Sequence, residues 1–418
     1  MYGLLDIALK TVVKTGTLHV TDPEGAVHEY GDGTGTPAGF RVTTPAAAAK
    51  IATDADLYLG ECYMDGSLEI TAGSLYAVMA LLMANAGTTN MPKPAKALYA
   101  LRRLIKRIDQ YNPVGKAKDN IARHYDLSGE LYDLFLDRDR QYSCAYFETD
   151  DGSLEDAQLA KKRHIAAKLH VKPGMKVLDI GSGWGGMGLY LAEICGAEVT
   201  GVTLSEEQHK LSNERALQRG VAERVRFQLQ DYRHLGQKFD RIVSIGMFEH
   251  VGVGHFKEFF QKVHGLLADD GVAVLHSINR SDGPGATSAW VKKYIFPGGY
   301  IPALSEVLPH IERSQLYVTD VEILRFHYAK TLREWTVRFA HNRDRARELY
   351  DERFCRMWEF YLVTAELAFR FAGMNNFQIQ MVKDQHALPL TRNYMVAEEE
   401  RLRAMDSRSP QLKSVPAE

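Results

Sequence analysis

Three closely spaced glycines in the stretch VLDIGSGWGG (177–186) point to a bound ligand. Gly181, Gly183 and Gly186 fit the pattern G-x-G-x-x-G directly after an apolar run that predicts a buried strand. Glycines in a tight turn let the backbone approach a ligand at the carboxyl end of a strand, because they carry no Cβ atom. The pattern is shared by folds that bind NAD, FAD and S-adenosylmethionine, so it predicts a nucleotide-like ligand without choosing among the three.

The residues around the glycines narrow this choice. A dinucleotide site needs an acidic residue at the tip of the second strand to hold a ribose. The second predicted strand, EVTGV (198–202), runs instead into TLSEEQ with no acid at its tip, so Thr203 and Gln208 are the side chains available there. VLDIGSGWG, with Asp179 inside the strand end, resembles the first motif of class I methyltransferases. In those proteins the glycine loop covers the methionine part of S-adenosylmethionine.

Strands alternate with helices from about residue 160 onward. Helical patterns separate five apolar segments, which are MKVLDIG, AEVTGVTL, RVRFQLQD, RIVSIGM and VAVLHSI. This alternation requires crossover connections and predicts a largely parallel sheet covered on both faces. The expected fold class is α/β, with a doubly wound, Rossmann-like sheet.

The rest of the chain predicts three further parts. Short strands, a helix and another strand in 1–90 predict a small α/β domain. A helical linker follows at 91–115, and the catalytic domain is expected at 116–398. The tail, 399–418, lacks apolar periodicity and is expected to be mobile.

The linker contains a basic amphipathic helix, MPKPAKALYALRRLIKRIDQYN (91–112). One interpretation is an interdomain helix with a solvated basic face. The other is a surface that meets anionic lipid, where each basic residue contributes about 1 kcal/mol. The basic residues are Lys93, Lys96, Arg102, Arg103, Lys106 and Arg107.

Composition excludes several classes of protein. The chain has 418 residues, of which 45% are hydrophobic, and a net charge of −2, so no overall field attracts nucleic acid. The four cysteines, Cys62, Cys144, Cys195 and Cys355, show no C-x-x-C spacing, so we expect no metal site, no disulfide framework and a reduced cytoplasmic setting. The start, MYGLLDIALK, lacks the basic region of a signal peptide. The apolar run LYAVMALLMANA (75–86) is too short for a bilayer of about 30 Å.

A set of motifs between about residues 115 and 390 resembles the cyclopropane fatty acid synthases. These motifs are HYDLSGELYDLFLD (124–137), YSCAYF (142–147), TLSEEQ (203–208), QDYR (230–233), GMFEHVG (246–252), LHSI (275–278), FPGGYIP (296–302) and HYAKTL (327–332). The front domain resembles the small lipid-binding domain of the bacterial members. The resemblance implies that S-adenosylmethionine donates a methyl group to the cis double bond of an acyl chain in a membrane phospholipid.

The chemistry of this family sets demands on the site. Attack of an alkene on the sulfonium methyl leaves a carbocation, and ring closure removes one proton from the transferred methyl. The site must therefore exclude water and present a base. The resemblance implies bicarbonate as that base, held by Glu249, His276 and Tyr328 and by backbone groups of Cys144 and Ile278. Because Glu249 would lie beside an anion, we expect its protons to be shared in a coupled titration.

The resemblance also implies a set of cofactor-binding residues. They are Tyr142, Ser143, Gly181, Ser182, Gly183, Thr203, Gln208, Gln230, Asp231 and Tyr232. Without the resemblance, simpler roles are open for the catalytic set: Glu249 as a helix N-terminal acid, His276 as a core histidine and Tyr328 as a packing tyrosine. The Cys144 thiol has no obvious basic partner in the sequence, so we interpret its backbone as the functional part.

One departure from the family's sequence pattern and two alternative functions leave questions open. Many relatives carry a cysteine where YLVTAELAFR has Ala365, which leaves the chain-length or double-bond preference undecided. A related enzyme would methylate the same alkene and give a methyl-branched or methylene chain. A lipid-binding carrier without catalysis is the second rival. A nucleic-acid methyltransferase is disfavoured because YNPV (111–114) lacks an aromatic residue after the proline. We expect a homodimer that associates peripherally with the inner face of the membrane.

Overall fold

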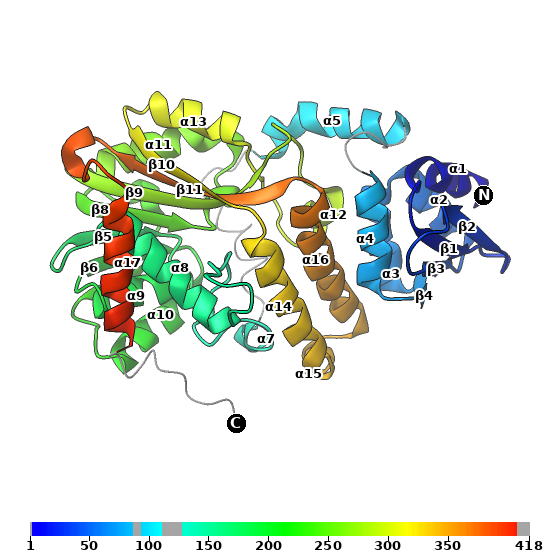
Figure 1. Ribbon diagram of the computed structural model, residues 1–418, viewed down its shortest axis with the longest axis horizontal. Coiled ribbons are helices and arrows are strands. Elements are labelled where there is room, and N and C mark those ends of the chain that lie inside the picture. Colours follow the sequence, from blue (N-terminus) through cyan, green and yellow to red (C-terminus); the bar gives the residue numbers. More distant parts are fainter. Residues whose placement is uncertain (1, 87–92, 111–127, 408–418) are drawn as a thin grey trace. The chain divides into compact units, whose positions relative to one another are not determined.

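The computed structural model describes residues 2–86, 93–110 and 128–407 (Figure 1). The chain divides into two compact units. The front unit comprises Met1–Asp109, Gly285–Gly299 and Tyr328–Met374, and the sheet unit comprises Gln110–Pro284, Tyr300–His327 and Asn375–Glu418. The predicted domain boundaries did not include the grouping of 285–299 and 328–374 with the beginning of the chain.

The sheet unit is built on a seven-stranded sheet with the order β10-β11-β9-β8-β5-β6-β7. Its strands are β5 (Lys176–Ile180), β6 (Glu198–Thr203), β7 (Val225–Leu229), β8 (Phe239–Ile245), β9 (Leu267–Arg280), β10 (Tyr317–Leu324) and β11 (Met374–Val382). The pairs β5·β6, β5·β8, β6·β7 and β8·β9 are parallel, whereas β10 pairs with β11 in antiparallel fashion. The predicted doubly wound α/β fold is confirmed, and β10 and β11 are strands that the sequence analysis missed.

Helices cover both faces of this sheet (Figure 1). They are α8 (Leu154–Leu169), α9 (Gly186–Glu193), α10 (Glu206–Gln218), α11 (Phe256–Leu266), α13 (Leu304–Glu312) and α17 (Asn393–Asp406), with a short helix α7 (Gly129–Asp133) before them. Alternate strand residues enter two apolar clusters: Leu178 and Ile242 pack with α11 and α13, and Val177 and Val243 pack with α8 and α9. Two buried faces explain why these strands are continuous apolar runs.

The segment 399–418, expected to be a mobile tail, is helical as far as residue 406. Helix α17 buries Leu402 in the cluster beneath α8, and Asp406 forms a buried ion pair with Arg163 of α8 at 2.7 Å. This helix has no broad apolar stripe and docks instead through Met395, Leu402 and charged contacts. Residues 408–418 lie outside the described part of the chain.

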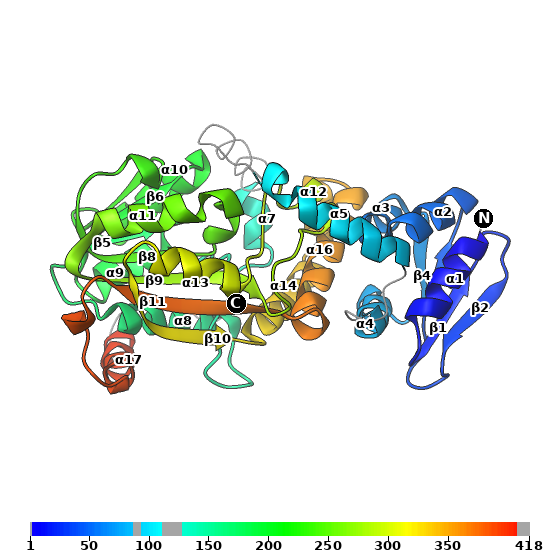
Figure 2. The same cartoon turned by 90° about the horizontal axis from the view of Figure 1, so that it is seen from above.

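The front unit begins with a four-stranded sheet in the order β2-β1-β3-β4. The strands are β1 (Thr17–Thr21), β2 (Val27–Gly31), β3 (Ala38–Val42) and β4 (Leu68–Ala72). Helix α1 (Tyr2–Val12) lies along β1 and β2, where the Tyr2 and Tyr30 hydroxyls are 2.8 Å apart (Figure 2). The remaining helices are α2 (Pro45–Thr53), α3 (Ala55–Asp65), α4 (Leu75–Ala86), α5 (Lys93–Asp109), α12 (Ala289–Tyr294), α14 (His327–His341), α15 (Arg343–Leu349) and α16 (Glu352–Phe371).

Later parts of the chain complete the core of the front unit. Trp290 of α12 is buried, donates from Nε1 to the Met64 sulfur at 3.3 Å, and contacts the Phe360 ring of α16. Gly60 of α3 allows this approach, because a Cβ there would lie 2.3 Å from Trp290 Nε1. Figure 1 shows α3, α4 and α16 side by side. Within the described ranges, no helix combines the length and apolar character needed to cross a membrane.

Replacing Leu402 by alanine tests the docking of α17. Loss of this buried side chain should lower the free energy of unfolding by about 2–5 kcal/mol, measured by urea denaturation. The exposed Val396 on the same helix is the matched control, and its change to alanine should cost less than about 0.5 kcal/mol. Equal small effects of both changes would show that α17 contributes no packing energy.

Candidate active site

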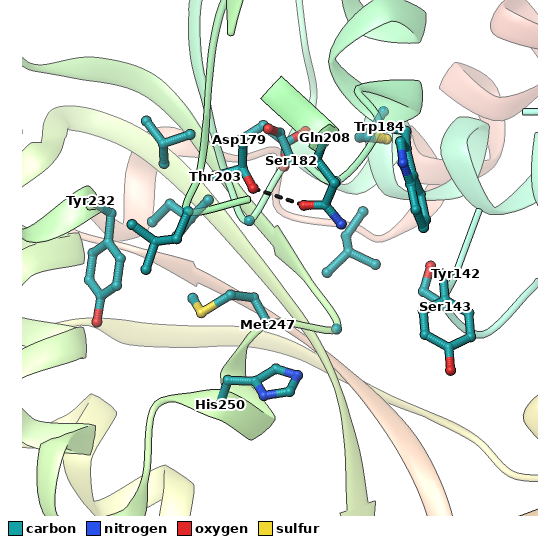
Figure 3. A pocket seen from close by; sticks show the side chains of 18 of the residues that line it. Tyr142, Ser143, Asp179, Ser182, Trp184, Thr203, Gln208, Tyr232, Met247 and His250 are labelled. Atoms are coloured by element: carbon teal, nitrogen blue, oxygen red, sulfur yellow. Dashed lines mark hydrogen bonds between the residues drawn. The ribbon is translucent and has the colours of Figure 1, made fainter. Parts of the chain in front are cut away.

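A pocket opens at the carboxyl ends of β5, β6 and β8 (Figure 3). All ten residues expected to bind the cofactor line it, namely Tyr142, Ser143, Gly181, Ser182, Gly183, Thr203, Gln208, Gln230, Asp231 and Tyr232. They come from segments that are far apart in the sequence. The parallel strands bring them together, because each segment follows the carboxyl end of a strand or packs against it.

The glycine loop requires glycine for two physical reasons. Gly181 and Gly183 have φ angles of 79° and 54°, in the left-handed region that side chains disfavour. A Cβ at Gly181 would lie 2.7 Å from the Met247 side chain, and one at Gly186 would lie 1.9 Å from the Gln141 amide nitrogen. The loop is therefore packed closely on both sides of the pocket.

The second strand presents a prearranged hydrogen-bond donor. The Thr203 hydroxyl donates to Gln208 Oε1 at 2.8 Å (Figure 3). Ser205 caps helix α10 by accepting a hydrogen bond from the Gln208 backbone N–H. Because the amide oxygen is occupied, Gln208 offers its amide nitrogen to the pocket.

Asp231 lies at the start of a 3₁₀ turn, Tyr232–His234. Its carboxylate accepts two hydrogen bonds from the Arg233 guanidinium, at 3.0 and 2.7 Å. Burial alone would raise the pKa of Asp231, but the paired Arg233 holds it below its ordinary value. Asp231 therefore stays ionised and keeps lone pairs that can accept from a ligand hydroxyl.

The pocket is also lined by residues that the predicted set left out, among them Asp179, Trp184 and His250. Burial raises the pKa of Asp179 to about 7, against the opposing effect of Lys161. Burial also lowers the pKa of His250 to about 4, so this imidazole is neutral at pH 7. The sequence offered a signal for each of them, since Asp179 is the next-to-last residue of the strand before the glycines, Trp184 belongs to the glycine loop and His250 follows Glu249.

Glu249 is a buried carboxyl group in the 3₁₀ turn Phe248–His250. Its Oε1 accepts from the Ile278 backbone N–H at 2.6 Å, and its Oε2 has no hydrogen-bond partner among the described residues. Burial raises the pKa of Glu249 to about 7, with the Ile278 N–H acting in the opposite direction. A carboxyl group with this pKa can both hold and release a proton near neutral pH.

His276 lies on β9, fully buried. The Gln378 amide nitrogen is 3.1 Å from His276 Nδ1 and can only donate, so the imidazole proton resides on Nε2. Burial lowers the pKa of His276 to about 3, so the ring is neutral. The Nε2 atom has no hydrogen-bond partner in the part of the chain that the structure describes. A buried donor without a partner suits an acceptor that arrives with the ligands.

The other three predicted catalytic residues have different placements. The Cys144 thiol is buried, lies 3.3 Å from the Ala145 carbonyl oxygen, and has a pKa raised by burial, so it is no nucleophile. The backbone N–H of Ile278, whose backbone groups were predicted to help bind the anion, donates to Glu249. Tyr328 belongs to the front unit, where its buried ring contacts Trp335 and Phe369.

Comparison with known families identifies the chain. The model of the family described as mycolic acid cyclopropane synthetase matches residues 114–379, more than half of the sequence. The chain belongs to this family. The cyclopropane synthase resemblance is thus confirmed, and the chain is an S-adenosylmethionine-dependent methyltransferase of lipid acyl chains. A second model, described as a domain of unknown function, matches residues 6–93.

Individual members of the cyclopropane synthase family are similar over most of their length. The cyclopropane-fatty-acyl-phospholipid synthase of Escherichia coli is 37% identical over 343 residues, which are 82% of this chain and 87% of that protein. The tuberculostearic acid methyltransferase UfaA1 of Mycobacterium tuberculosis is 34% identical, covering 85% and 87%. The crystal structure of mycolic acid cyclopropane synthase CmaA1 complexed with SAH and CTAB is 34% identical with a TM-score of 0.61, covering 65% of this chain and 99% of that one.

The raised pKa of Glu249 predicts a pH-dependent change in stability. The folded protein binds more protons than the unfolded chain between pH 4.5 and about 7, so this residue lowers stability as the pH rises. Glu249→Gln removes the titration and keeps an acceptor for Ile278. The variant should gain stability relative to the native protein between pH 5 and pH 8, by at most about 3 kcal/mol.

Urea denaturation at the two pH values measures this difference. Glu312, an exposed glutamate of α13, provides the matched control. The change Glu312→Gln should alter the difference between pH 5 and pH 8 by less than about 0.5 kcal/mol. A Glu249→Gln variant that tracks the native protein at both pH values would exclude a raised pKa.

Proposed function

We propose that this family member transfers a methyl group to the cis double bond of an unsaturated phospholipid acyl chain and closes a cyclopropane ring, with bicarbonate as the base. The observation that carries this proposal is the pair of buried, incompletely bonded groups Glu249, in the turn after β8, and His276, on the neighbouring strand β9. A methyl transfer that stops at a branched chain also needs a base, but the ring requires that base at the transferred methyl itself.

The pocket residues fit S-adenosylmethionine. Gly181 and Gly183 allow close approach of the backbone, Gln208 offers an amide donor and Asp231 offers an ionised acceptor. Asp179, buried beside the glycine loop, has one oxygen with no hydrogen-bond partner within the described ranges. Mixed donors and acceptors around an apolar wall suit a ligand with adenosine and amino-acid ends.

The residues around Glu249 also fit a small anion such as bicarbonate. His276 offers a buried Nε2–H, and Glu249 is close to half protonated at neutral pH, so both can donate a hydrogen bond to an anion. A backbone group of Cys144 would complete the cage. Because Ile278 already donates to Glu249, its proposed role changes from anion ligand to support of the carboxyl group.

When bound, S-adenosylmethionine and bicarbonate would supply an electrophilic methyl group and a base. The ionised form of Glu249 can then take up the proton that leaves the new methyl group, since its raised pKa allows it to be protonated at neutral pH. His276, held by Gln378, fixes the orientation of the anion through Nε2. Burial of both residues keeps water away from the carbocation.

Product analysis tests the proposed reaction. The purified protein is incubated with S-adenosylmethionine and vesicles of a monounsaturated anionic phospholipid, and the fatty acid methyl esters are analysed by mass spectrometry and proton NMR. We expect one added CH2, upfield ring protons and loss of the alkene signal. Glu249→Gln should lower the rate at least about 100-fold, whereas the exposed control Glu312→Gln should leave it unchanged.

Two other outcomes would favour the rivals. Retained alkene protons with one added carbon would indicate a related enzyme that gives a methyl-branched or methylene chain. Vesicle binding without any added carbon would indicate a lipid carrier.

We further propose that helix α5 of the front unit meets an anionic membrane surface. Lys96 and Arg103 are exposed on this helix. Arg102, expected to face lipid, forms ion pairs with Asp54 at 2.5 Å and Asp56 at 2.8 Å, so it attaches α5 to the helices α2 and α3 instead. The side chains of Lys93, Lys106 and Arg107 lie outside the described residues. A homodimer at the inner face of the membrane would double these contacts.

The double substitution Lys96→Gln with Arg103→Gln tests this surface. Each removed charge should weaken binding to vesicles containing anionic phospholipid about fivefold, measured by co-sedimentation at low salt. Arg224→Gln with Arg226→Gln removes two exposed charges from the sheet unit and should leave binding unchanged. Equal losses in the two double variants would indicate only a general charge effect.

A further inference from the structure

Lys161 is a fully buried lysine that no predicted role uses. It lies on α8, its side chain is 0% exposed, and its ammonium donates to Gln141 Oε1 at 2.7 Å and to Ser143 Oγ at 2.8 Å. It forms no ion pair with any residue in the described part of the chain. Burying an ammonium group is costly unless its hydrogen bonds are satisfied. Here two neutral oxygen atoms provide those hydrogen bonds.

Gln158, one turn earlier on α8, binds the backbone of the same residues, Gln141 and Ser143. Its amide nitrogen donates to the carbonyl oxygens of Gln141 at 3.3 Å and Ser143 at 3.0 Å. Together Gln158 and Lys161 make four hydrogen bonds to residues 141–143. These residues line the cofactor pocket (Figure 3), so α8 fixes one wall of it.

The direction of these hydrogen bonds determines what Ser143 can offer a ligand. An ammonium group only donates, so the Ser143 oxygen accepts from Lys161 and its own proton is left to donate. No described residue accepts that proton. Gln141 is different, because its oxygen accepts from Lys161 while its nitrogen donates to Asp139 at 3.1 Å. Ser143 is therefore preset as a donor, with a positive charge directly behind it.

The positive charge of Lys161 determines which group of a ligand is favoured as the acceptor for the Ser143 hydroxyl. The carboxylate of its amino-acid part is the one anionic group of S-adenosylmethionine, whereas its sulfonium and α-ammonium groups are cationic and its adenine is neutral. A positive charge near Ser143 attracts the carboxylate and repels the two cationic groups. A hydrogen bond from a polarised hydroxyl to a carboxylate is also stronger than one to a neutral acceptor.

We propose that Lys161 is a positioning residue for the cofactor, which holds Ser143 as the donor to the carboxylate of S-adenosylmethionine. This inference rests on the proposed cofactor role of Ser143. It gives α8 a function that neither the motifs nor the pocket lining assigns. It also explains why a lysine is kept where burial disfavours its charge.

Binding of two ligands to Lys161→Met tests the inference by calorimetry. S-adenosylhomocysteine carries the carboxylate, and 5′-methylthioadenosine lacks the whole amino-acid part. The variant should bind S-adenosylhomocysteine at least about tenfold more weakly, since a charge-assisted hydrogen bond is lost. Its affinity for 5′-methylthioadenosine should change less than about threefold. A purely structural defect would weaken both ligands equally and would overturn the inference.

A double-variant cycle with Ser143→Ala tests whether Lys161 acts through this hydroxyl. The double variant should lose no more affinity for S-adenosylhomocysteine than Ser143→Ala alone, within about twofold. Losses that multiply would contradict the inference. Lys257→Met, at an exposed lysine of α11, controls for loss of a positive charge and should bind both ligands normally. A native protein that binds neither ligand would refute the proposed cofactor site instead.

A pH titration of the native protein applies even if Lys161→Met does not fold. Burial lowers the pKa of Lys161 to about 8, against the attraction of nearby carboxylates. The titratable groups that face it are Asp137, Asp139, Cys144, Lys162, Asp179 and His276. The affinity for S-adenosylhomocysteine relative to 5′-methylthioadenosine should fall above pH 8 as Lys161 loses its proton. Ser143→Ala should lack this fall, and an equal fall in the two proteins would overturn the inference.

Discussion

The parallel register of β5, β6 and β8 is the constraint on which the rest of the site depends. Ile180 of β5 pairs with Val202 of β6 on one side and with Ser244 of β8 on the other. The three strands therefore end at the same level of the sheet, where the segments that follow them line the pocket. Register is firmly specified here, because both faces are buried and a shift by one residue would exchange the two apolar clusters.

Burial shifts the pKa values of two side chains near the ends of these strands. It raises the pKa of Glu249 to about 7 and lowers that of His276 to about 3, because a buried site disfavours the charged form of each group. Incompletely bonded groups such as Glu249 Oε2 and His276 Nε2 lower the stability of the protein by itself. Active sites commonly carry this kind of cost, because function needs groups that the fold alone would not favour.

Helix α8 connects the site to the rest of the sheet unit through charge. Lys161 points to the pocket wall, while Arg163 and His164 bind acidic residues contributed by distant segments. His164 lies between Glu322 of β10 and Glu399 of α17, at 2.7 and 2.6 Å. The two carboxylates raise the pKa of His164 although burial opposes them. One helix thus joins an edge strand, the C-terminal helix and the ligand pocket.

The sequence by itself determined the parts of this protein whose signals are local. The glycine loop and the five parallel strands follow from apolar runs and the small residues beside them, and parallel strands place the segments that follow them at one edge of the sheet. The ten pocket residues came from the resemblance of short motifs to those of the cyclopropane synthases. Tertiary structure alone decided the features that join distant segments. Leu402 and Asp406 order α17 only because α8 lies beside them, and Trp290 joins the front unit only because Gly60 leaves room for it. Lys161 is ordinary in the sequence, since a lysine in a helix is usually solvated, and only burial against Ser143 gives its charge a direction.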